Sequence, residues 1–225
     1  PFLIDNFKFD LRIYVLITSC DPFRIYIYEE GLARFATHKY EKPNKENLNN
    51  IYMHLTNYSV QRNSSKFDRN EISGTKRRSS TIYEWFKEHE FDADAIWKSI
   101  DDVIIKTMLC ANNSIQHHYC ATFPDQYRTS ACFELLGFDV ILDDKLKPFV
   151  LEVNHSPSLE TETNIDVLIK SQLLKDVFNL VNSVPTNIKN ISDVERIRSA
   201  ERLYWSRNKY MSSRKSSFEY KKISV

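Results

Sequence analysis

The chain has 225 residues, of which 42% are hydrophobic, so it is long enough to bury one sizeable core. Its three glycines leave no glycine-rich nucleotide loop in this stretch. Its four cysteines are widely spaced, without a CxxC pair, so we expect reduced thiols in a cytosolic compartment rather than a zinc site or disulfides. No apolar run approaches the roughly 18 residues of a membrane span, and no signal peptide is visible.

The net charge of +1 hides an asymmetry between the body of the chain and its end. Residues 187–225 hold ten Lys or Arg and four Asp or Glu, so the remainder is acidic. A basic tail predicts an anionic partner, such as an acidic protein surface, a nucleic acid or a membrane, although a solvated charged helix has the same composition. Because Pro1 directly precedes strand-like sequence, we interpret the chain as a fragment.

The first forty residues predict three short strands. Phe9–Cys20 alternates and is rich in β-branched and aromatic residues, which is typical of a strand. Asp21-Pro22 is a turn signal, and Arg24–Tyr28 is the second expected strand. Gly31 interrupts the pattern before a third strand over Leu32–Thr37. Three consecutive strands favour an antiparallel meander.

Residues 38–80 are polar, and the stretch 61–80 carries six Lys or Arg without apolar periodicity, which predicts a loop or lid. A short helix is expected over Ile82–His89. Apolar residues then recur at helical spacing over Asp92–His118, so a long amphipathic helix is expected there, capped by Asp92 or Asp94.

The rest of the chain predicts a hairpin followed by helices. Ala131–Leu142 and Leu146–Val153 are the two expected strands, joined by a turn at residues 143–145. Helices are expected over Asp166–Asn182 and, in the charged tail, over Ser192–Tyr210, with the last fifteen residues frayed. The order of elements indicates an α+β fold, an antiparallel sheet with flanking helices.

The hairpin carries the most chemical pattern in the sequence. Glu152 and Asn154 are two apart on one strand, so they face the same side, and pairing can bring Asp139 opposite them. Carboxylate and amide oxygens are hard ligands suited to Mg²⁺, and two carboxylates held together repel unless a cation lies between them. The alternative is an exposed polar face, which the apolar strands around this set disfavour.

Basic groups elsewhere could meet a nucleotide or a carboxylate. Lys8, Asp10 and Arg12 stand at i, i+2 and i+4 of the first strand, hence on one face. Arg34 suits a bidentate carboxylate or phosphate contact, and Lys76 supplies a point charge. Each of these groups taken alone is also compatible with an ordinary surface charge.

Five motifs follow one another along the chain: Lys8–Arg12 (KFDLR), Gly31–Phe35 (GLARF), His54–Ser59 (HLTNYS), Gly137–Asp139 (GFD) and Leu151–Ser158 (LEVNHSPS). Taken alone, Thr56–Ser59 in the third motif would be a turn or a cap. Together and in this order, the motifs resemble the tubulin tyrosine ligase-like family, close to its polyglutamylase branch, over roughly residues 1–183.

The resemblance implies an ATP-grasp fold, in which a nucleotide lies between two α+β subdomains and the C-terminal one holds Mg²⁺. Residues 1–183 would be the C-terminal portion of that catalytic region, and residues 184–225 a basic helical tail. The family's N-terminal domain and its glycine-rich phosphate cover are missing from this stretch, so the fragment alone is expected to have weak or no activity.

The resemblance also implies a role for each matching residue. Along ATP would lie Lys8, Phe9, Asp10, Thr56 and Asn57. Mg²⁺ would be bound by Asp139, Glu152 and Asn154. The incoming free L-glutamate would be held by Arg34, Tyr58, Ser59 and Lys76. His155 would contact the acceptor glutamate of the protein substrate. The catalytic set would be Arg34, Lys76 and His155.

The implied reaction is ATP-dependent addition of glutamate to side-chain carboxylates of a protein, expected to be tubulin, through an acylphosphate. A glycine- or tyrosine-adding ligase of the same fold, or a silent microtubule-binding fragment, are the alternatives. Arg34 favours glutamate, because glycine and tyrosine have no γ-carboxylate to hold. We expect a monomer that binds microtubules in the cytoplasm and cytoskeleton, at a cilium or basal body in some settings, with no nucleic-acid or membrane partner.

Overall fold

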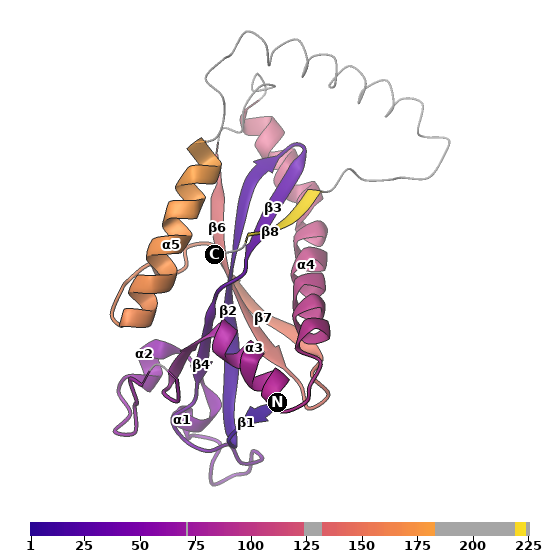
Figure 1. Ribbon diagram of the computed structural model, residues 1–225. Coiled ribbons are helices and arrows are strands. Elements are labelled where there is room, and N and C mark those ends of the chain that lie inside the picture. Colours follow the sequence, from indigo (N-terminus) through magenta and orange to yellow (C-terminus); the bar gives the residue numbers. More distant parts are fainter. Residues whose placement is uncertain (71, 124–131, 183–218, 224–225) are drawn as a thin grey trace.

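The computed structural model describes residues 1–70, 72–123, 132–182 and 219–223 (Figure 1). These residues form an open, largely antiparallel sheet with helices on both faces, which confirms the expected α+β class. The strands are β1 Leu3–Ile4, β2 Phe7–Cys20, β3 Phe23–Tyr28, β4 Leu32–Phe35, β5 Lys76–Arg78, β6 Glu134–Leu142, β7 Pro148–Asn154 and β8 Glu219–Ile223. The helices are α1 Ile51–His54, α2 Tyr58–Gln61, α3 Ser79–Glu88, α4 Ala93–Thr122 and α5 Asn164–Asn182.

Strand β2 is the centre of the sheet. On one edge, residues 15–20 of β2 pair with β3 and residues 9–12 pair with β4, so β3 and β4 follow one another along the same edge. On its other edge, β2 pairs with β6, which in turn pairs with β7. The expected meander is therefore wrong for β4. The 14 residues of β2 offer an edge long enough for both shorter strands in succession.

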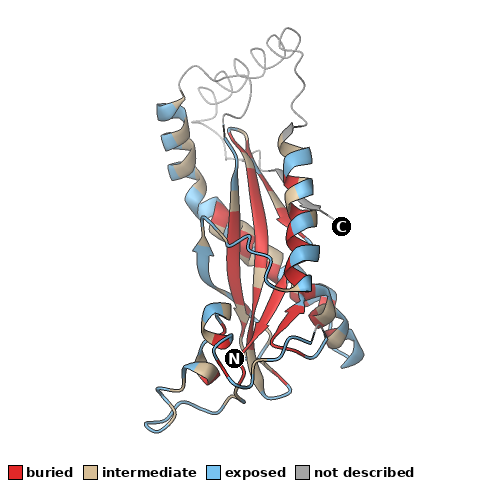
Figure 2. Cartoon of the chain, turned by 90° about the vertical axis from the view of Figure 1, so that its left-hand side faces the viewer, coloured by how far each residue is buried: buried red, intermediate tan, exposed pale blue. Residues whose placement is uncertain are grey.

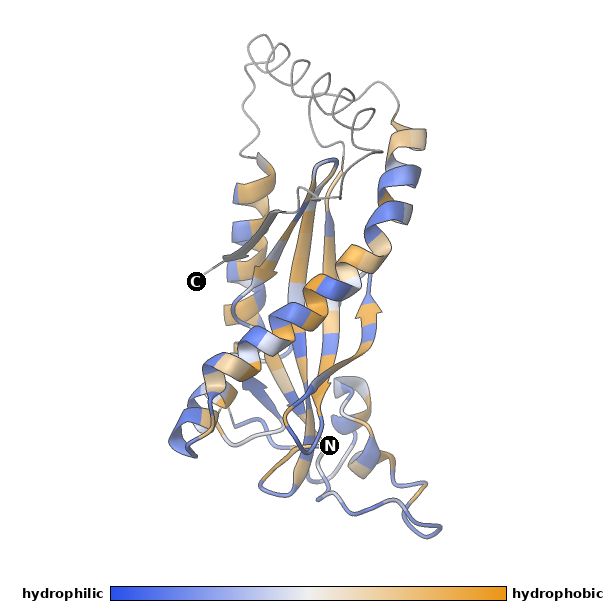
Figure 3. Cartoon of the chain, turned by 90° about the vertical axis from the view of Figure 1, so that its right-hand side faces the viewer, coloured by the Kyte–Doolittle hydropathy of each residue, from blue (hydrophilic) through white to orange (hydrophobic). Residues whose placement is uncertain are grey.

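The two faces of the sheet have separate cores, as alternation along β2 requires. Odd-numbered residues such as Leu11 and Ile13 pack with α3 and α4. In α4, the buried residues Ile96, Ile100 and Ile104 form an apolar stripe. Figure 3 shows α4 lying diagonally across this face. Even-numbered Tyr14 and Leu16 pack under α5 on the opposite face. Figure 2 shows the buried residues concentrated in the central strands.

The predicted long helix and the predicted hairpin are confirmed. The carboxylate of Asp92 accepts a hydrogen bond from the backbone N–H of Ala95 at 2.9 Å and so caps α4. In the hairpin turn, Asp143 Oδ1 accepts from the backbone N–H groups of Lys145 and Lys147. Across the helices of the described ranges, none combines the length and the apolar character that crossing a membrane requires. The four cysteines all lie in the described residues, and none of them forms a disulfide bond.

Two segments expected to lack regular structure form strands. Lys76–Arg78, predicted as part of a loop, pairs antiparallel with β4. Its three basic residues give no alternation that would reveal a strand, but Arg77 stacks over the Phe35 ring at 4.0 Å. Glu219–Ile223, predicted to be frayed, pairs parallel with β3 as β8. The helix expected over Ser192–Tyr210 lies outside the described residues.

Glu30 fixes the break between β3 and β4 to the start of α3. Its Oε1 accepts from the Ser79 hydroxyl at 2.7 Å and from the Ser80 backbone N–H at 3.1 Å. Its Oε2 accepts from the Ser80 hydroxyl at 2.7 Å and from Arg78 Nη2 at 2.6 Å. An anion at the first turn of a helix is favourable, and Glu30 thus takes the role of a cap. Next to it, Gly31 is required, because a Cβ there would lie 2.5 Å from the Arg12 carbonyl oxygen.

Glu30→Gln is expected to lower the free energy of unfolding by about 2 kcal/mol at neutral pH, because buried donors lose a charged acceptor. Burial alone would raise the pKa of Glu30, but the hydrogen bonds from Ser79, Ser80 and Arg78 outweigh it and hold the pKa below 4.5. Ionised Glu30 therefore stabilises the folded state at pH values above the pKa of an unperturbed Glu, and this stabilisation is lost as the pH falls through the lowered pKa of Glu30. Urea unfolding of both proteins should show the difference shrinking at acidic pH, and a constant difference would contradict this account.

Candidate functional site

One face of β2 carries the polar residues that the i, i+2, i+4 spacing predicted. Asp10 and Arg12 lie on the α5 side of the sheet, while Phe9 belongs to the core on the α4 side. The Phe9 ring stacks on Phe35 with ring centroids 5.2 Å apart. Of the residues expected along a nucleotide, Phe9 therefore presents only its backbone to the polar face.

Four charged side chains interlock across three strands, and we call them the charge quartet: Asp10, Arg12, Arg34 and Asp139. The strand register sets Asp10 opposite Arg34 and Arg12 opposite Asp139. Arg34 Nε donates to Asp10 Oδ1 at 2.8 Å, and Arg34 Nη2 lies 2.7 Å from Asp139 Oδ2. Arg12 donates through Nε to Asp139 Oδ1 and through Nη2 to Oδ2, the latter at 3.0 Å. Two carboxylates and two guanidinium groups thus balance in charge.

Two members of the quartet, Asp139 and Arg34, are held ionised although they are buried. Burial alone would raise the pKa of Asp139, but hydrogen bonds and charge from Arg12 and Arg34 outweigh burial and hold the pKa below its usual value. For Arg34, burial alone would lower the pKa, but the charge and hydrogen bond of Asp10, with help from Asp139, raise it above its usual value. Asp139 is therefore charged at neutral pH, and the two arginines fix its position.

The other residues predicted to lie along ATP border this quartet. Thr56 Oγ1 donates to Asp10 Oδ2 at 2.9 Å, which links the loop before α2 to β2. Lys8 Nζ donates to the backbone carbonyl of His54 at 2.5 Å, and burial lowers the pKa of this lysine. Asn57 stands at the N-cap position of α2, although its side chain makes no capping hydrogen bond.

The three predicted metal ligands share the polar face at the hairpin. Asp139 is paired with Glu152 in the β6–β7 register, and Asn154 is paired with Gly137. Asn154 Nδ2 donates to Glu152 Oε1 at 3.0 Å. Glu152 is exposed, whereas Asp139 is only 2% exposed. The register shift after Asp139 leaves the pairing of Glu152 intact.

The chemistry of this donor set fits Mg²⁺. An ionised carboxylate has about four lone-pair positions, and the arginines use three of those on Asp139, so one remains for a cation. Within the described residues, no three His, Cys, Asp or Glu side chains gather as a metal cage. Mg²⁺ needs no such cage, because it is usually held by one or two carboxylates together with water and phosphate oxygens.

Lys76 forms a second buried charge centre beside the quartet. Lys76 Nζ lies 2.7 Å from Asp166 Oδ2 and 3.8 Å from the centroid of the Tyr58 ring. Lys170 Nζ lies 2.9 Å from Asp166 Oδ1 as an ion pair without hydrogen-bond geometry. Burial lowers the pKa of Lys76, and Asp166 opposes that shift.

A cleft of about 390 Å³ joins these groups, a volume typical of a small-molecule site. It brings together residues of α2, β4, β5 and the β7 end, including seven of the predicted site residues: Arg34, Asn57, Tyr58, Ser59, Lys76, Glu152 and Asn154. Four further predicted residues do not line the cleft themselves but lie next to its lining, as the contacts given above show: Lys8, Asp10, Thr56 and Asp139. His155 is exposed, with the Ser156 hydroxyl 3.0 Å from its Nδ1.

The cleft also contains residues to which no specific role was assigned from the sequence. They are Arg12, Tyr14, Leu32, Arg62, Ser156, Pro157, Ser158, Glu160, Glu162, Asp166 and Lys170. Asp166 had a local signal, because Thr163-x-x-Asp166 before an apolar run is a helix-start pattern. That pattern predicts a helix cap, but it does not predict that Asp166 pairs with Lys76 of β5.

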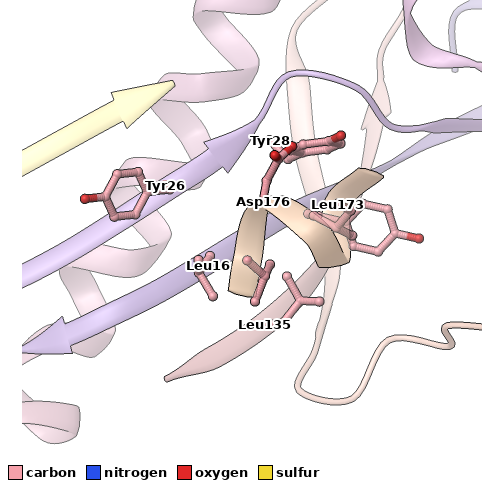
Figure 4. A pocket seen from close by; sticks show the side chains of 8 residues that line it. Leu16, Tyr26, Tyr28, Leu135, Leu173 and Asp176 are labelled. Atoms are coloured by element: carbon pink, nitrogen blue, oxygen red, sulfur yellow. The ribbon is translucent and has the colours of Figure 1, made fainter. Parts of the chain in front are cut away.

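Helix α5 is held above the cleft by apolar contacts further along the sheet. Figure 4 shows Leu16 and Leu135 of the sheet beside Leu173 and Asp176 of α5, with Tyr26 and Tyr28 around them. Only about 10 Å³ of space is left between them. Burial, followed by the charge of Asp176, raises the pKa of Tyr28 to about 12, so its hydroxyl stays neutral. This packing fixes the position of the first turn of α5.

Comparisons with known proteins agree on one family. A sequence profile described as the tubulin-tyrosine ligase family matches residues 1–191. The chain is 52% identical over 198 residues to tubulin polyglutamylase TTLL6 of Mus musculus, covering 88% of this chain and 24% of that protein. It is 49% identical over 222 residues to tubulin polyglutamylase TTLL13 of Mus musculus, covering 97% and 28%. A probable beta-tubulin polyglutamylase of Tetrahymena thermophila is 44% identical over 187 residues, covering 81% and 16%.

Proposed function

Because this chain belongs to the tubulin-tyrosine ligase family, we propose that its protein is an ATP-dependent ligase that adds glutamate to side-chain carboxylates of a protein, with tubulin as the substrate. Of the relatives given above, two are named tubulin polyglutamylases and one a probable beta-tubulin polyglutamylase, at 44–52% identity over most of this chain. The chain spans about a quarter of the length of the first relatives it matches, so the proposed activity is that of the whole protein.

Residues 1–183 would be the C-terminal portion of an ATP-grasp catalytic region, the part that holds metal and amino acid. The open antiparallel sheet with a polar face supports this assignment. Residues 184–225 would form a basic tail that binds the acidic microtubule surface, as their charge supports, with residues 219–223 returning to the sheet as β8.

The observation that carries the proposal is the composition of the cleft. Hard oxygen ligands on β7, namely Glu152 and Asn154, line the same cleft as the cations Arg34 of β4 and Lys76 of β5. Phosphoryl transfer depends mainly on positioning and on neutralising charge, and an amino acid with two carboxylates needs cations. A cleft that offers both metal ligands and cations is suited to binding the phosphoryl group and the amino acid side by side.

In the proposed reaction the acceptor carboxylate takes the γ-phosphoryl group of ATP and becomes an acylphosphate, while ADP leaves. The free amine of glutamate then attacks the acyl carbon, the C–N isopeptide bond forms as the C–O bond to phosphate breaks, and phosphate and the amine proton are released. Bound Mg²⁺ would neutralise charge on the transferring phosphoryl group. Asp139, Glu152 and Asn154 would hold that metal, and Arg12 and Arg34 keep Asp139 ionised for this purpose.

The remaining roles divide by place on the polar face. Lys8, Asp10, Thr56, Asn57 and the backbone of Phe9 would lie along ATP. Incoming glutamate would be held by Tyr58, Ser59 and the catalytic cations Arg34 and Lys76. The exposed His155 would contact the acceptor glutamate. We expect the protein to be a monomer in the cytoplasm and cytoskeleton, and at cilia or basal bodies in some settings. Neither a nucleic acid nor a membrane is an expected partner.

The test uses the full-length protein with MgATP and tubulin, supplied in turn with glutamate, glycine or tyrosine. We expect ATP-dependent addition of glutamyl residues to side-chain carboxylates, read by mass spectrometry of the tubulin tails. Incorporation of glycine or tyrosine alone would contradict the glutamate assignment. Microtubule binding without any addition would instead identify a silent binding protein.

A further inference from the structure

Asp166 lies in the first turn of α5 with none of its surface exposed. Its Oδ2 accepts from the backbone N–H of Thr163 at 3.2 Å, and its own backbone N–H donates to Thr163 Oγ1 at 3.3 Å. This reciprocal pair is a capping box, which satisfies the free donors at a helix start. Capping alone would explain a carboxylate here.

Capping does not explain the two ammonium groups that Asp166 also holds. Lys76 comes from β5, ninety positions earlier in the chain, and Lys170 from the next turn of α5. Lys76 and Lys170 are buried, and a buried lysine without a partner is costly. Burial would raise the pKa of Asp166, but hydrogen bonds from Lys76 and Thr163 and the ion pair with Lys170 outweigh burial and lower the pKa. The carboxylate therefore stays charged and joins β5 to α5.

The contact fixes where the Lys76 ammonium can be. A lysine has a flexible four-carbon stem, so its charge has a defined position only when contacts restrain it. Here Nζ lies between Asp166 Oδ2 and the Tyr58 ring, at the wall of the cleft. Lys76 and Lys170 share Asp166, and the Lys76 ammonium at the wall of the cleft can attract the carboxylate of a small ligand.

We propose that Asp166 is a positioning residue: it holds the Lys76 ammonium against the Tyr58 ring and thereby sets the affinity of the cleft for a carboxylate-bearing amino acid. This inference rests on the proposed function, because Lys76 is assigned there to incoming glutamate. The side chain acts through Lys76 and not by contact with the reacting atoms.

The experiment compares Asp166→Asn with Thr163→Ala in the full-length protein. Asparagine keeps an oxygen acceptor for the cap but loses the charge that anchors Lys76. Thr163→Ala removes the capping hydroxyl and leaves the carboxylate in place. We expect Asp166→Asn to raise the KM for glutamate by at least about tenfold with a smaller change in the KM for ATP, since a charge-assisted hydrogen bond is lost. Thr163→Ala should lower the melting temperature while leaving the KM for glutamate near that of the wild type.

Equal KM values for Asp166→Asn and the wild type, or equal KM shifts in both variants, would overturn the proposal and leave Asp166 a cap. If the wild type adds no glutamate at all, the proposed function has failed instead, and the two failures are distinct. Should Asp166→Asn not fold, Asp166→Asn with Lys170→Met removes one unpaired cation and is compared with Lys170→Met alone. A raised KM for glutamate in the double variant supports the proposal, and an unchanged KM refutes it.

Discussion

Glu152→Gln in the full-length protein is expected to slow ATP-dependent addition of glutamate about a thousandfold, because a metal that stabilises transition-state charge is worth several kcal/mol. Glutamine keeps the shape of Glu152 and its contact with Asn154 but removes the charge that would face the cation. The measurement is the initial rate of labelled glutamate incorporation into tubulin across a Mg²⁺ titration. The free energy of unfolding should change by no more than about 0.5 kcal/mol, because Glu152 is exposed.

The matched control is Glu84→Gln. Glu84 is 62% exposed on α3, which packs on the opposite face of the sheet, and its ion pair with Lys87 is 3.8 Å long. This variant should retain the wild-type rate at every Mg²⁺ concentration. A wild-type rate for Glu152→Gln under limiting Mg²⁺ would show that the hairpin is not the metal site.

The sequence identifies elements whose pattern is local. Alternation predicted β2 and the β6–β7 hairpin, and helical spacing predicted α4, because each period is set by the geometry of the element itself. The same rule placed Asp10 and Arg12 on one face, and Glu152 with Asn154 on one face. Strand β5 was missed because Lys76–Arg78 is entirely basic, and its strand conformation depends on pairing with β4.

Contacts between distant segments could not be predicted in the same way. Nothing local states that β3 and β4 share an edge of β2, yet this arrangement decides that Arg34 meets Asp10 and Asp139. From sequence, Arg34 was a free cation for a substrate carboxylate. In the structure, Arg34 already holds two aspartates, so any contact with glutamate uses the part of its guanidinium left over. The pairing of Lys76 with Asp166 likewise depends on how α5 packs on the sheet.

The charge quartet gives the largest expected effect on stability. Arg34→Met is expected to lower the free energy of unfolding by about 3–5 kcal/mol, because Asp10 and Asp139 remain buried with too few cations. Adding Asp10→Asn to Arg34→Met should recover part of this loss, since it removes one of the stranded charges. Urea unfolding of the two single variants and the double variant gives the coupling energy directly.

The comparison that isolates burial is Arg62→Met, which breaks the ion pair between Arg62 and Glu162. That pair has an N–O distance of 3.2 Å, but its side chains are 51% and 37% exposed. Solvent screens such a pair, so Arg62→Met should cost no more than about 1 kcal/mol. If Arg34→Met were as mild as Arg62→Met, or if the effects of Arg34→Met and Asp10→Asn simply added, the quartet would not be a coupled unit.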